Sequence, residues 1–340
     1  MGTKRIIICC DGTWNNPEQK EVTNVVKVAR ALRPAGSGGT PQVVFYDWGV
    51  GTEGGLGARL AGGAFGRGLD KNIQDAYRFL VHNYREGDEI CFFGFSRGAY
   101  TARSTVGMIR NVGVLRKEFA GLIPRAYRMY RSRVTPDAAA ARRFRRDYSR
   151  EVRIRFIGVW DTVGALGIPL KVVRELVGRG KYDFHDTRLS RIVDHAAHAV
   201  AVDERRVDFK PALWRRRPTP GLVLEQAWFA GVHCDVGGGY RETGLADIAL
   251  MWMAAQAERA GLVFDRNYLA EIARPDVRGK LHRSRRGIYW AKRPYIRPIG
   301  RLGPRLEKIH PSVWERLAAV PRYRPKNVPG ELAAPAGWNA

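Results

Sequence analysis

A serine lies between two glycines in residues 94–98, which read GFSRG. An apolar run, residues 89–93, precedes this pentapeptide, and a run compatible with a helix, residues 99–103, follows it. The pattern G-x-S-x-G between a buried strand and a helix holds a serine hydroxyl on a sharp, strained turn, where it can act as a nucleophile. The helix N-terminus directs its free N–H groups toward the position of a developing oxyanion. The context therefore predicts that Ser96 is a nucleophile, with a purely structural turn as the alternative.

A nucleophilic serine needs a base, and the base needs an acid that orients it. In α/β-hydrolases the chain order is serine, acid, histidine, and we expect the acid at the carboxyl end of a strand, where crevices form in parallel sheets. Asp161 directly follows the predicted strand 152–160, the first strand after the serine. We therefore expect Asp161 to be the acid, with a capping role as the alternative. Asp203 and Asp208 are weaker candidates because no predicted strand precedes them.

Six histidines follow the serine, and one of them ends a predicted strand. His233 comes directly after the apolar run 222–232 and begins a glycine-rich turn, from which its ring can lie over the nucleophile. We therefore expect His233 to be the base, and His310 is the second candidate. The others lie in polar segments (His185 and His282) or in the helix-like stretch 189–200, where packing or capping contacts are expected (His195 and His198).

The oxyanion hole is expected to use two backbone N–H groups. One belongs to Arg97, the residue after the nucleophile, and the other to Gly12 or Thr13, in the loop after the first predicted strand. Two further acids are assigned supporting roles. Asp11 lies beside the same loop, and Asp235 is expected to brace the glycine-rich turn that contains it.

Two cofactor-dependent alternatives use some of the same segments. Asp11, Asp161 and Asp235 could bind a metal ion together with the candidate histidine, but no paired spacing such as H-x-x-x-H occurs. Residues 49–54 match the dinucleotide pattern G-x-G-x-x-G, yet further glycines stand where a helix should begin. We therefore expect no metal and no cofactor. We interpret residues 49–68 as a glycine-rich loop near an active-site mouth, with a plain surface loop as the alternative.

Strands that alternate with helices must position these residues. Apolar runs predict strands at residues 4–10, 42–48, 89–95, 152–160 and 222–232. One helical pattern begins after a cap at Thr23 or Asn24, and another follows the serine turn. Further helical patterns occur at residues 69–85, within 117–149 and at 245–260. This alternation predicts an α/β fold, a doubly wound and mainly parallel sheet with helices on both faces, like that of α/β-hydrolases.

We expect a single domain over residues 1–340, with a core at about 4–264. The segment from about 265 to 340 is rich in Pro, Arg and Gly, and it is interpreted as a loop-rich tail packed on the core, with one short helix near 312–319. Residues 165–177 are amphipathic and could form a lipid-facing flap, with an ordinary surface helix as the alternative.

The chain carries a formal net charge of +25, and about half of the excess lies after residue 265. This charge is consistent with peripheral contact with an anionic membrane surface, whereas a coding bias toward arginine is the alternative. Nucleic acid is not expected as a partner, because zinc-finger spacing, RNP-type aromatic patterns and basic heptads are missing. Nothing in the sequence fixes the oligomeric state.

Four cysteines in mostly apolar settings, with no signal peptide and no long apolar span, suggest a protein that is cytoplasmic as synthesised. Secretion without a signal peptide is compatible with these features.

Four motifs, in this order, resemble the α/β-hydrolase domain of type VI secretion phospholipase effectors and their uncharacterised stand-alone relatives. They read CDGTWN, GFSRGAYTAR, GVWDTV and WFAGVHCDVGGGY at residues 10–15, 94–103, 158–163 and 228–240. The resemblance covers roughly residues 4–330 and implies the same triad, Ser96–Asp161–His233. It also implies ester hydrolysis, with phospholipids as the best-known substrates of secreted members.

The sequence therefore predicts a serine hydrolase that cleaves carboxylic esters of lipids or phospholipids through an acyl-enzyme. One alternative is a small-molecule carboxylesterase that does not act on membranes. The other is a non-catalytic binding protein on a hydrolase scaffold.

Overall fold

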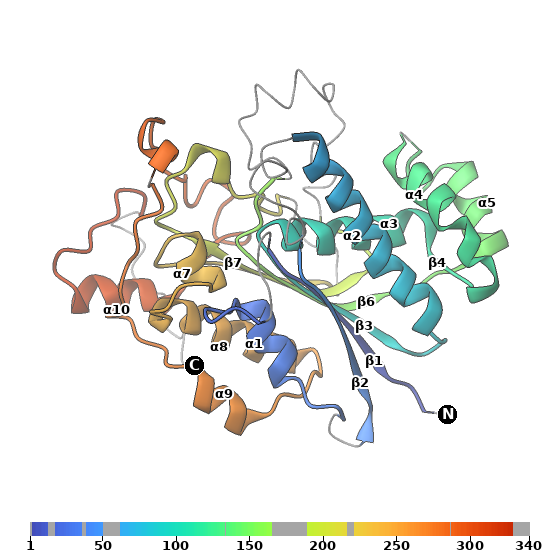
Figure 1. The fold of residues 1–340 in the computed structure, drawn as a ribbon, viewed down its shortest axis with the longest axis horizontal. Coiled ribbons are helices and arrows are strands. Elements are labelled where there is room, and N and C mark those ends of the chain that lie inside the picture. Colours follow the sequence, from blue (N-terminus) through green and yellow to red (C-terminus); the bar gives the residue numbers. More distant parts are fainter. Residues whose placement is uncertain are drawn as a thin grey trace.

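A computed structural model describes residues 2–12, 18–35, 39–49, 62–132, 134–164, 189–215, 221–285 and 287–328 of the chain. The centre is a seven-stranded sheet in which all neighbouring strands are parallel (Figure 1). The strand order is β2-β1-β3-β6-β7-β8-β9. The strands span Arg5–Cys10 (β1), Gln42–Asp47 (β2), Glu89–Phe95 (β3), Ile154–Trp160 (β6), Val193–Ala201 (β7), Val223–Phe229 (β8) and Lys308–Ile309 (β9).

Helices connect most of these strands. They span Asn24–Ala31 (α1), Gly62–Asn83 (α2), Arg97–Val112 (α3), Ile123–Arg131 (α4), Ala139–Tyr148 (α5), His233–Gly237 (α7), Gly244–Arg259 (α8), Arg266–Ile272 (α9) and Pro311–Ala319 (α10). Short 3₁₀ turns lie at Lys117–Leu122 (η3), Val207–Phe209 (η4) and Gly287–Trp290 (η5), and a small antiparallel pair joins Val114–Leu115 (β4) to Ser149–Arg150 (β5).

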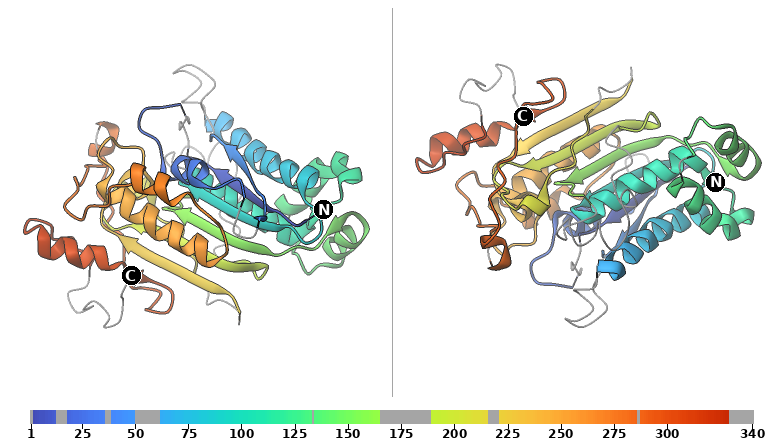
Figure 2. Two further views of the ribbon diagram at one scale, coloured as in Figure 1. Left: turned by 90° about the horizontal axis from the view of Figure 1, so that it is seen from below. Right: turned by 90° about the horizontal axis from the view of Figure 1, so that it is seen from above.

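The sheet lies between two layers of helices because its strands are apolar on both faces. In β1, Ile6 and Ile8 belong to a buried cluster with residues of α2, α3 and α4. Ile7 and Cys9 belong to a second cluster, with residues of α1, α8 and α9. Successive side chains of a strand point to opposite faces, so such a strand must be covered twice. The two views of Figure 2 each show one of these helical layers over the sheet. The predicted doubly wound α/β fold is confirmed.

The strand register brings several loops to one edge of the sheet. Cys10, at the end of β1, pairs with Asp47 in β2 and with Gly94 in β3. Phe95, at the end of β3, pairs with Trp160 at the end of β6. Because the strands are parallel, the loops that follow them open at the same carboxyl edge, where ligands bind in open α/β sheets.

The predicted helix-like stretch 189–200 is wrong, because Val193–Ala201 forms the strand β7 between β6 and β8. The segment VDHAAHAVA is rich in alanine, a strong helix former, and it lacks an alternating polar pattern. All but one of its residues are buried. Burial between two parallel neighbours outweighs the helix propensity of the segment.

Two further expectations need correction. Helix α2 begins at Gly62, inside the range 49–68 that was predicted to be irregular, and residues 50–61 lie outside the described part of the chain. The C-terminal segment is not only loops and one helix, since its residues Lys308–Ile309 add β9 to the edge of the sheet beside β8. The predicted flap at 165–177 also lies outside the described residues.

The C-terminal segment has its own apolar contacts with the sheet. Ile309, Val313 and Tyr323 form a third buried cluster with Val200 of β7 and Trp228 of β8. In the described part of the chain, no helix combines the length and apolar character that crossing a membrane requires.

Candidate active site

Ser96 occupies a strained turn between β3 and α3. Its backbone has φ 58° and ψ −117°, a conformation that non-glycine residues rarely adopt, and its N–H donates to the Trp160 carbonyl at 3.0 Å. The glycines of the motif are required by close packing. A Cβ at Gly94 would lie 2.7 Å from the Cα of Ala99, and one at Gly98 would lie 2.1 Å from the carbonyl oxygen of Cys10. The strand and the helix therefore approach closely and present the serine at the carboxyl edge of the sheet.

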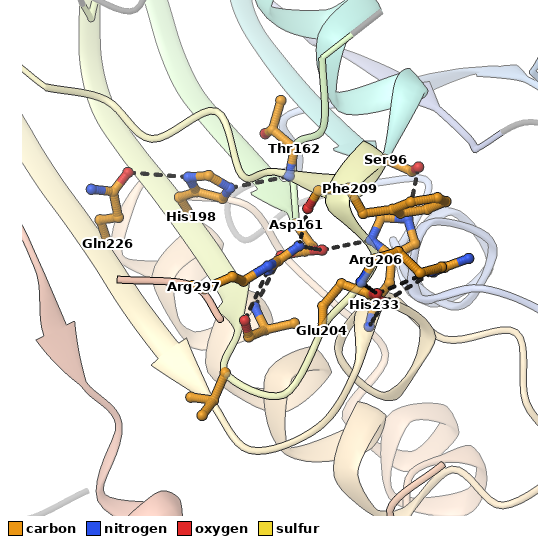
Figure 3. Close-up of polar contacts among 12 residues, drawn as sticks. Ser96, Asp161, Thr162, His198, Glu204, Arg206, Phe209, Gln226, His233 and Arg297 are labelled. Atoms are coloured by element: carbon orange, nitrogen blue, oxygen red, sulfur yellow. Dashed lines mark hydrogen bonds and ion pairs between the residues drawn. The ribbon is translucent and has the colours of Figure 1, made fainter. Parts of the chain in front are cut away.

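Three side chains from three different connections meet at this edge (Figure 3). Ser96 Oγ lies 2.8 Å from His233 Nε2, and His233 Nδ1 lies 2.5 Å from Asp161 Oδ2. Asp161 follows β6, and His233 is the first residue of α7, directly after β8 and its short turn. An ionised carboxylate can only accept hydrogen bonds, so Nδ1 carries the proton and Nε2 is left to accept one from the serine. The structure thus brings together the predicted nucleophile, acid and base.

A fully buried arginine from the C-terminal segment binds the same carboxylate. Arg297 donates from Nη1 to Asp161 Oδ1 at 2.6 Å and from Nη2 to Asp161 Oδ2 at 3.0 Å. It also donates to the carbonyls of Ala201 at 2.8 Å and Phe209 at 2.6 Å. The N–H of Ala201 donates to Asp161 Oδ1 at 2.9 Å. Arg297 was missed by the sequence analysis, since it is one of many cations in a segment without a motif.

These contacts influence the pKa values of Asp161 and His233. Burial alone would raise the pKa of Asp161, but the charge of Arg297 and the hydrogen bond from His233 outweigh it and hold this pKa well below its ordinary value. Burial lowers the pKa of His233, and the hydrogen bond to Asp161 only partly reverses this effect. At neutral pH the acid is therefore ionised and the imidazole is neutral, the state that a general base requires.

The backbone donors predicted for an oxyanion differ in their settings. Arg97 is the first residue of α3, directly after the serine, so its N–H lies at the helix N-terminus. The Gly12 N–H donates to Asp11 Oδ1 at 2.6 Å in this structure, and the predicted role of Gly12 in the oxyanion hole stays a prediction. Thr13 lies outside the described residues.

A family model described as the catalytic domain of Tle1-like phospholipase effectors of the type VI secretion system matches residues 4–256. The chain belongs to this family. The resemblance seen in the four motifs is confirmed.

The chain is also similar to individual proteins of known sequence or structure. An uncharacterized protein of Saccharomyces cerevisiae is 32% identical over 238 residues, which make up 63% of this chain and 33% of the yeast protein. The chain thus spans about one third of that relative. An uncharacterized protein from Pseudomonas aeruginosa, of known crystal structure, shares the fold with a TM-score of 0.50 at 19% identity, over 81% of this chain and 49% of its own. A butyrate-bound esterase from Thermogutta terrifontis is 13% identical with a TM-score of 0.41, over 76% of this chain and 84% of its own.

The imidazole of the Tle1-like site is held between two aromatic rings. Phe95 lies 4.6 Å from the His233 ring centroid, and Phe209 packs edge-on at 5.0 Å. The Arg206 guanidinium lies 3.4 Å above the Phe209 ring. Arg206 also pairs with the fully buried Glu204, at 2.9 Å between Nη2 and Oε2, and the same Oε2 accepts from the His233 N–H at 3.3 Å. Glu204, Arg206 and Phe209 were not predicted as parts of the site, because η4 and its flanks carry no motif.

A buried histidine supports the turn after Asp161. The Thr162 N–H donates to His198 Nε2 at 3.2 Å, and His198 Nδ1 lies 3.1 Å from Gln226 Oε1 (Figure 3). Burial lowers the pKa of His198 to about 3, so its ring is neutral and Nε2 can accept. Asp161 itself has a positive φ of 36°. His198 therefore stabilises an unusual backbone conformation, rather than capping a helix.

The two supporting acids brace loops around the site. Asp11 Oδ2 accepts from the hydroxyls of Thr23 and Tyr46, each at 2.6 Å, which ties the end of β1 to α1 and β2. Asp235 accepts from the Val232 N–H at 3.0 Å and lies 2.6 Å from Nδ1 of His282. The second bond joins the turn after β8 to the C-terminal segment.

The weaker candidates lie elsewhere. His310 caps α10, interacts with Ser312 and stacks on Phe229 at 4.4 Å between centroids. Asp203 accepts from the Gly231 N–H at 2.8 Å, and Asp208 pairs with a lysine. His195 lies 3.1 Å from the amide oxygen of Gln256, and His185 lies outside the described residues. In the described part of the chain, no group of three His, Cys, Asp or Glu side chains is arranged to hold a metal ion.

Proposed function

We propose that this chain hydrolyses acyl esters of lipids, and of phospholipids in particular, through a covalent acyl-enzyme on Ser96. The observation that carries the proposal is the hydrogen-bond relay from Ser96 Oγ to His233 Nε2 (2.8 Å) and from His233 Nδ1 to Asp161 Oδ2 (2.5 Å). A neutral imidazole in hydrogen-bond contact with a strained serine is the arrangement of an activated nucleophile. The match to a phospholipase family supports the class of substrate.

In the first half-reaction, Ser96 Oγ attacks the carbonyl carbon of the ester while His233 Nε2 takes the hydroxyl proton. Asp161 stays ionised and stabilises the imidazolium. The negative charge that forms on the carbonyl oxygen is stabilised by the Arg97 N–H at the start of α3, with Gly12 or Thr13 as the expected second donor. Collapse of the tetrahedral intermediate expels the alcohol, which receives the proton from His233.

In the second half-reaction, water attacks the acyl-enzyme and His233 accepts its proton. The carboxylic acid leaves when the proton returns to Ser96 Oγ. The contacts of the Phe95 and Phe209 rings with the imidazole keep it in one orientation through both steps. This constraint matters because a base that rotates away from the serine loses the contact that activates it.

Removal of the nucleophile tests the proposal. We expect Ser96→Ala to lower kcat for a p-nitrophenyl ester by roughly 10⁴-fold or more and to abolish labelling by a fluorophosphonate probe, since loss of a triad member leaves only binding and oxyanion effects. Ser132→Ala, an exposed serine at the end of α4, is the matched control and should behave as wild type.

Wild-type turnover and labelling by Ser96→Ala would refute the mechanism. An intact fold with no labelling of the wild-type chain would instead favour a binding protein on this scaffold. Release of fatty acid from phospholipid vesicles separates a phospholipase from a carboxylesterase, because the latter cleaves the soluble ester and leaves the vesicles intact.

A further inference from the structure

A large apolar side chain is exposed on a short segment beside the active site. Trp290, at the end of η5, is 77% exposed, the highest value for a large hydrophobic residue in the described part of the chain. Ile296, on the same segment, is 47% exposed. In Figure 1 this orange segment protrudes at the upper left. Large apolar side chains that face water on one short segment indicate a surface that another phase or molecule covers.

The surrounding segment is strongly basic. Residues 283–297 contain six Lys and Arg residues and no Asp or Glu. Three of these cations have internal roles: Arg285 donates to the carbonyls of Tyr289, Trp290 and Lys292, Lys292 pairs with Asp208, and Arg297 binds Asp161. Arg283 and Arg293 are exposed, and neither forms an ion pair within the described residues. Their charges therefore face solvent, and in the sequence they flank the tryptophan.

Internal contacts hold this segment in place against the site. The Tyr289 ring lies edge-on to Phe209 at 6.1 Å, and Phe209 contacts the His233 ring at 5.0 Å. The Tyr295 N–H donates to the Arg205 carbonyl at 2.9 Å, and Lys210 Nζ lies 4.8 Å from the centre of the Tyr295 ring. Trp290 thus lies on a folded turn, one residue from Tyr289, whose ring packs against Phe209 beside His233.

We propose that residues 283–285 and 287–296, the Trp290 segment, form a docking surface for an anionic phospholipid bilayer. The indole and Ile296 enter the boundary between headgroups and acyl chains, a position that tryptophan favours because its ring is apolar with one polar N–H. Arg283 and Arg293 contact the anionic headgroups, and the overall charge of the chain attracts it to such a surface. The inference rests on the proposed function, since docking there presents the site to lipid.

Vesicle binding tests this surface without interference from hydrolysis. The full chain carrying Ser96→Ala is sedimented with vesicles of phosphatidylcholine, with and without phosphatidylglycerol. We expect binding that requires the anionic lipid and weakens at high salt. Adding Trp290→Ala, or Arg283→Gln with Arg293→Gln, should weaken binding by roughly tenfold in each case.

Matched variants separate this surface from general effects of charge and exposure. Val223 is 47% exposed at the start of β8, at the opposite edge of the sheet, so Val223→Ala should bind as the parent does. Arg128→Gln with Arg142→Gln removes the same charge from the exposed faces of α4 and α5, and it should have less effect than the Arg283 and Arg293 pair.

A second assay distinguishes failure of the docking surface from failure of the proposed function. In the chain with Ser96 intact, the Trp290 and Arg variants should hydrolyse a soluble p-nitrophenyl ester at the wild-type rate. Vesicle binding that is absent, or equal in all variants, would overturn the docking surface even if ester hydrolysis is confirmed. Trp290-dependent vesicle binding without ester hydrolysis would leave the surface standing and refute the proposed chemistry.

Discussion

At the scale of single residues, the site depends on an arginine that touches the acid and not the nucleophile. Arg297 covers both oxygens of Asp161 with no exposure to solvent. A carboxylate buried at this depth would otherwise be costly to ionise. Arg297 thereby keeps Asp161 charged, and its own positive charge also limits how strongly Asp161 can stabilise an imidazolium.

These two effects of Arg297 predict that Arg297→Gln shifts the pH dependence of kcat/KM. The groups that face His233 are Asp161, Ser96, Glu204, Arg206 and the two aromatic rings. Without the Arg297 charge, the pKa of Asp161 rises and the uncompensated carboxylate raises the pKa of His233. The change at His233 moves the acidic limb of kcat/KM to higher pH, by about one unit, which lowers activity at neutral pH by roughly threefold.

The matched variant is Arg297→Lys, which keeps the positive charge but loses the two-pronged contact. Its profile should stay near that of the wild type while its rate falls. If Arg297 only held the fold together, Arg297→Gln would lose activity equally at all pH values. That result, measured with the p-nitrophenyl ester, would contradict a role in setting the protonation of the pair.

At the scale of elements, the site requires the start of α3 to touch the end of β1. A Cβ at Gly98 would lie 2.1 Å from the Cys10 carbonyl oxygen and 2.4 Å from that of Asp11. We therefore expect Gly98→Ala to push the helix from the strand and to lower the free energy of unfolding by about 2 kcal/mol or more, in the range of an overpacked core. Denaturant unfolding should show the lower free energy of unfolding, and labelling of Ser96 by the fluorophosphonate probe should decrease.

Gly121, in η3, is the control for this substitution, since a Cβ there meets nothing within 4 Å. Gly121→Ala should leave stability and labelling unchanged or slightly raise stability, because alanine restricts the unfolded chain. Wild-type stability and labelling in Gly98→Ala would show that the contact between β1 and α3 does not fix the serine turn.

The elements also show what could be predicted from the sequence. Mostly apolar runs predicted β1, β2, β3, β6 and β8 to within a few residues, because strands in the middle of a parallel sheet are mostly apolar. The same logic failed for β7, whose alanines fit a helix as well as a buried strand. Ser96, Asp161 and His233 could be predicted because each follows a predicted strand in the sequence. The structure places their side chains in contact.

The remaining parts of the site depend on tertiary contacts. Arg297 approaches Asp161 across 136 positions of chain, and nothing in its local sequence distinguishes it from the other arginines of the segment. Phe209 and Glu204 lie in a connection without periodicity, and their relation to His233 is created by how that connection folds over the sheet. The hydrogen bond from the Gly12 N–H to the adjacent Asp11 is likewise a contact that position in the sequence does not predict.

At the scale of the whole molecule, the C-terminal segment contributes to the surface, to the candidate site and to the sheet. Within it, Trp290 faces solvent, Arg297 binds the acid, and Ile309 extends the sheet. A loop-rich composition here does not mean a detachable tail. Because one stretch of chain supplies both the proposed lipid contact and a partner of Asp161, truncation before it would remove the two together.

The whole molecule should also lose stability as the pH falls from 6.5 to 5. Burial lowers the pKa of His195, His198, His233 and His310, to about 3 for His198 and about 4 for His310. The unfolded chain binds protons on these rings below their ordinary value near 6.5, whereas the native chain does not. The contribution of these rings to stability is therefore greatest above pH 6.5 and falls with pH, by about 2 kcal/mol per fully buried ring at pH 5. Asp47, whose pKa burial raises to about 6, offsets part of this loss.

His310→Asn isolates one of these rings away from the active site. Asparagine can still cap α10, so the fold should persist, although the stacking on Phe229 is lost and stability at pH 7 should fall by about 1 kcal/mol. The loss between pH 7 and pH 5 should then be smaller than in the wild type by up to about 2 kcal/mol. Urea unfolding followed by tryptophan fluorescence at the two pH values measures both quantities. An unchanged difference between them would mean that His310 takes up its proton in the native state and does not contribute to acid sensitivity.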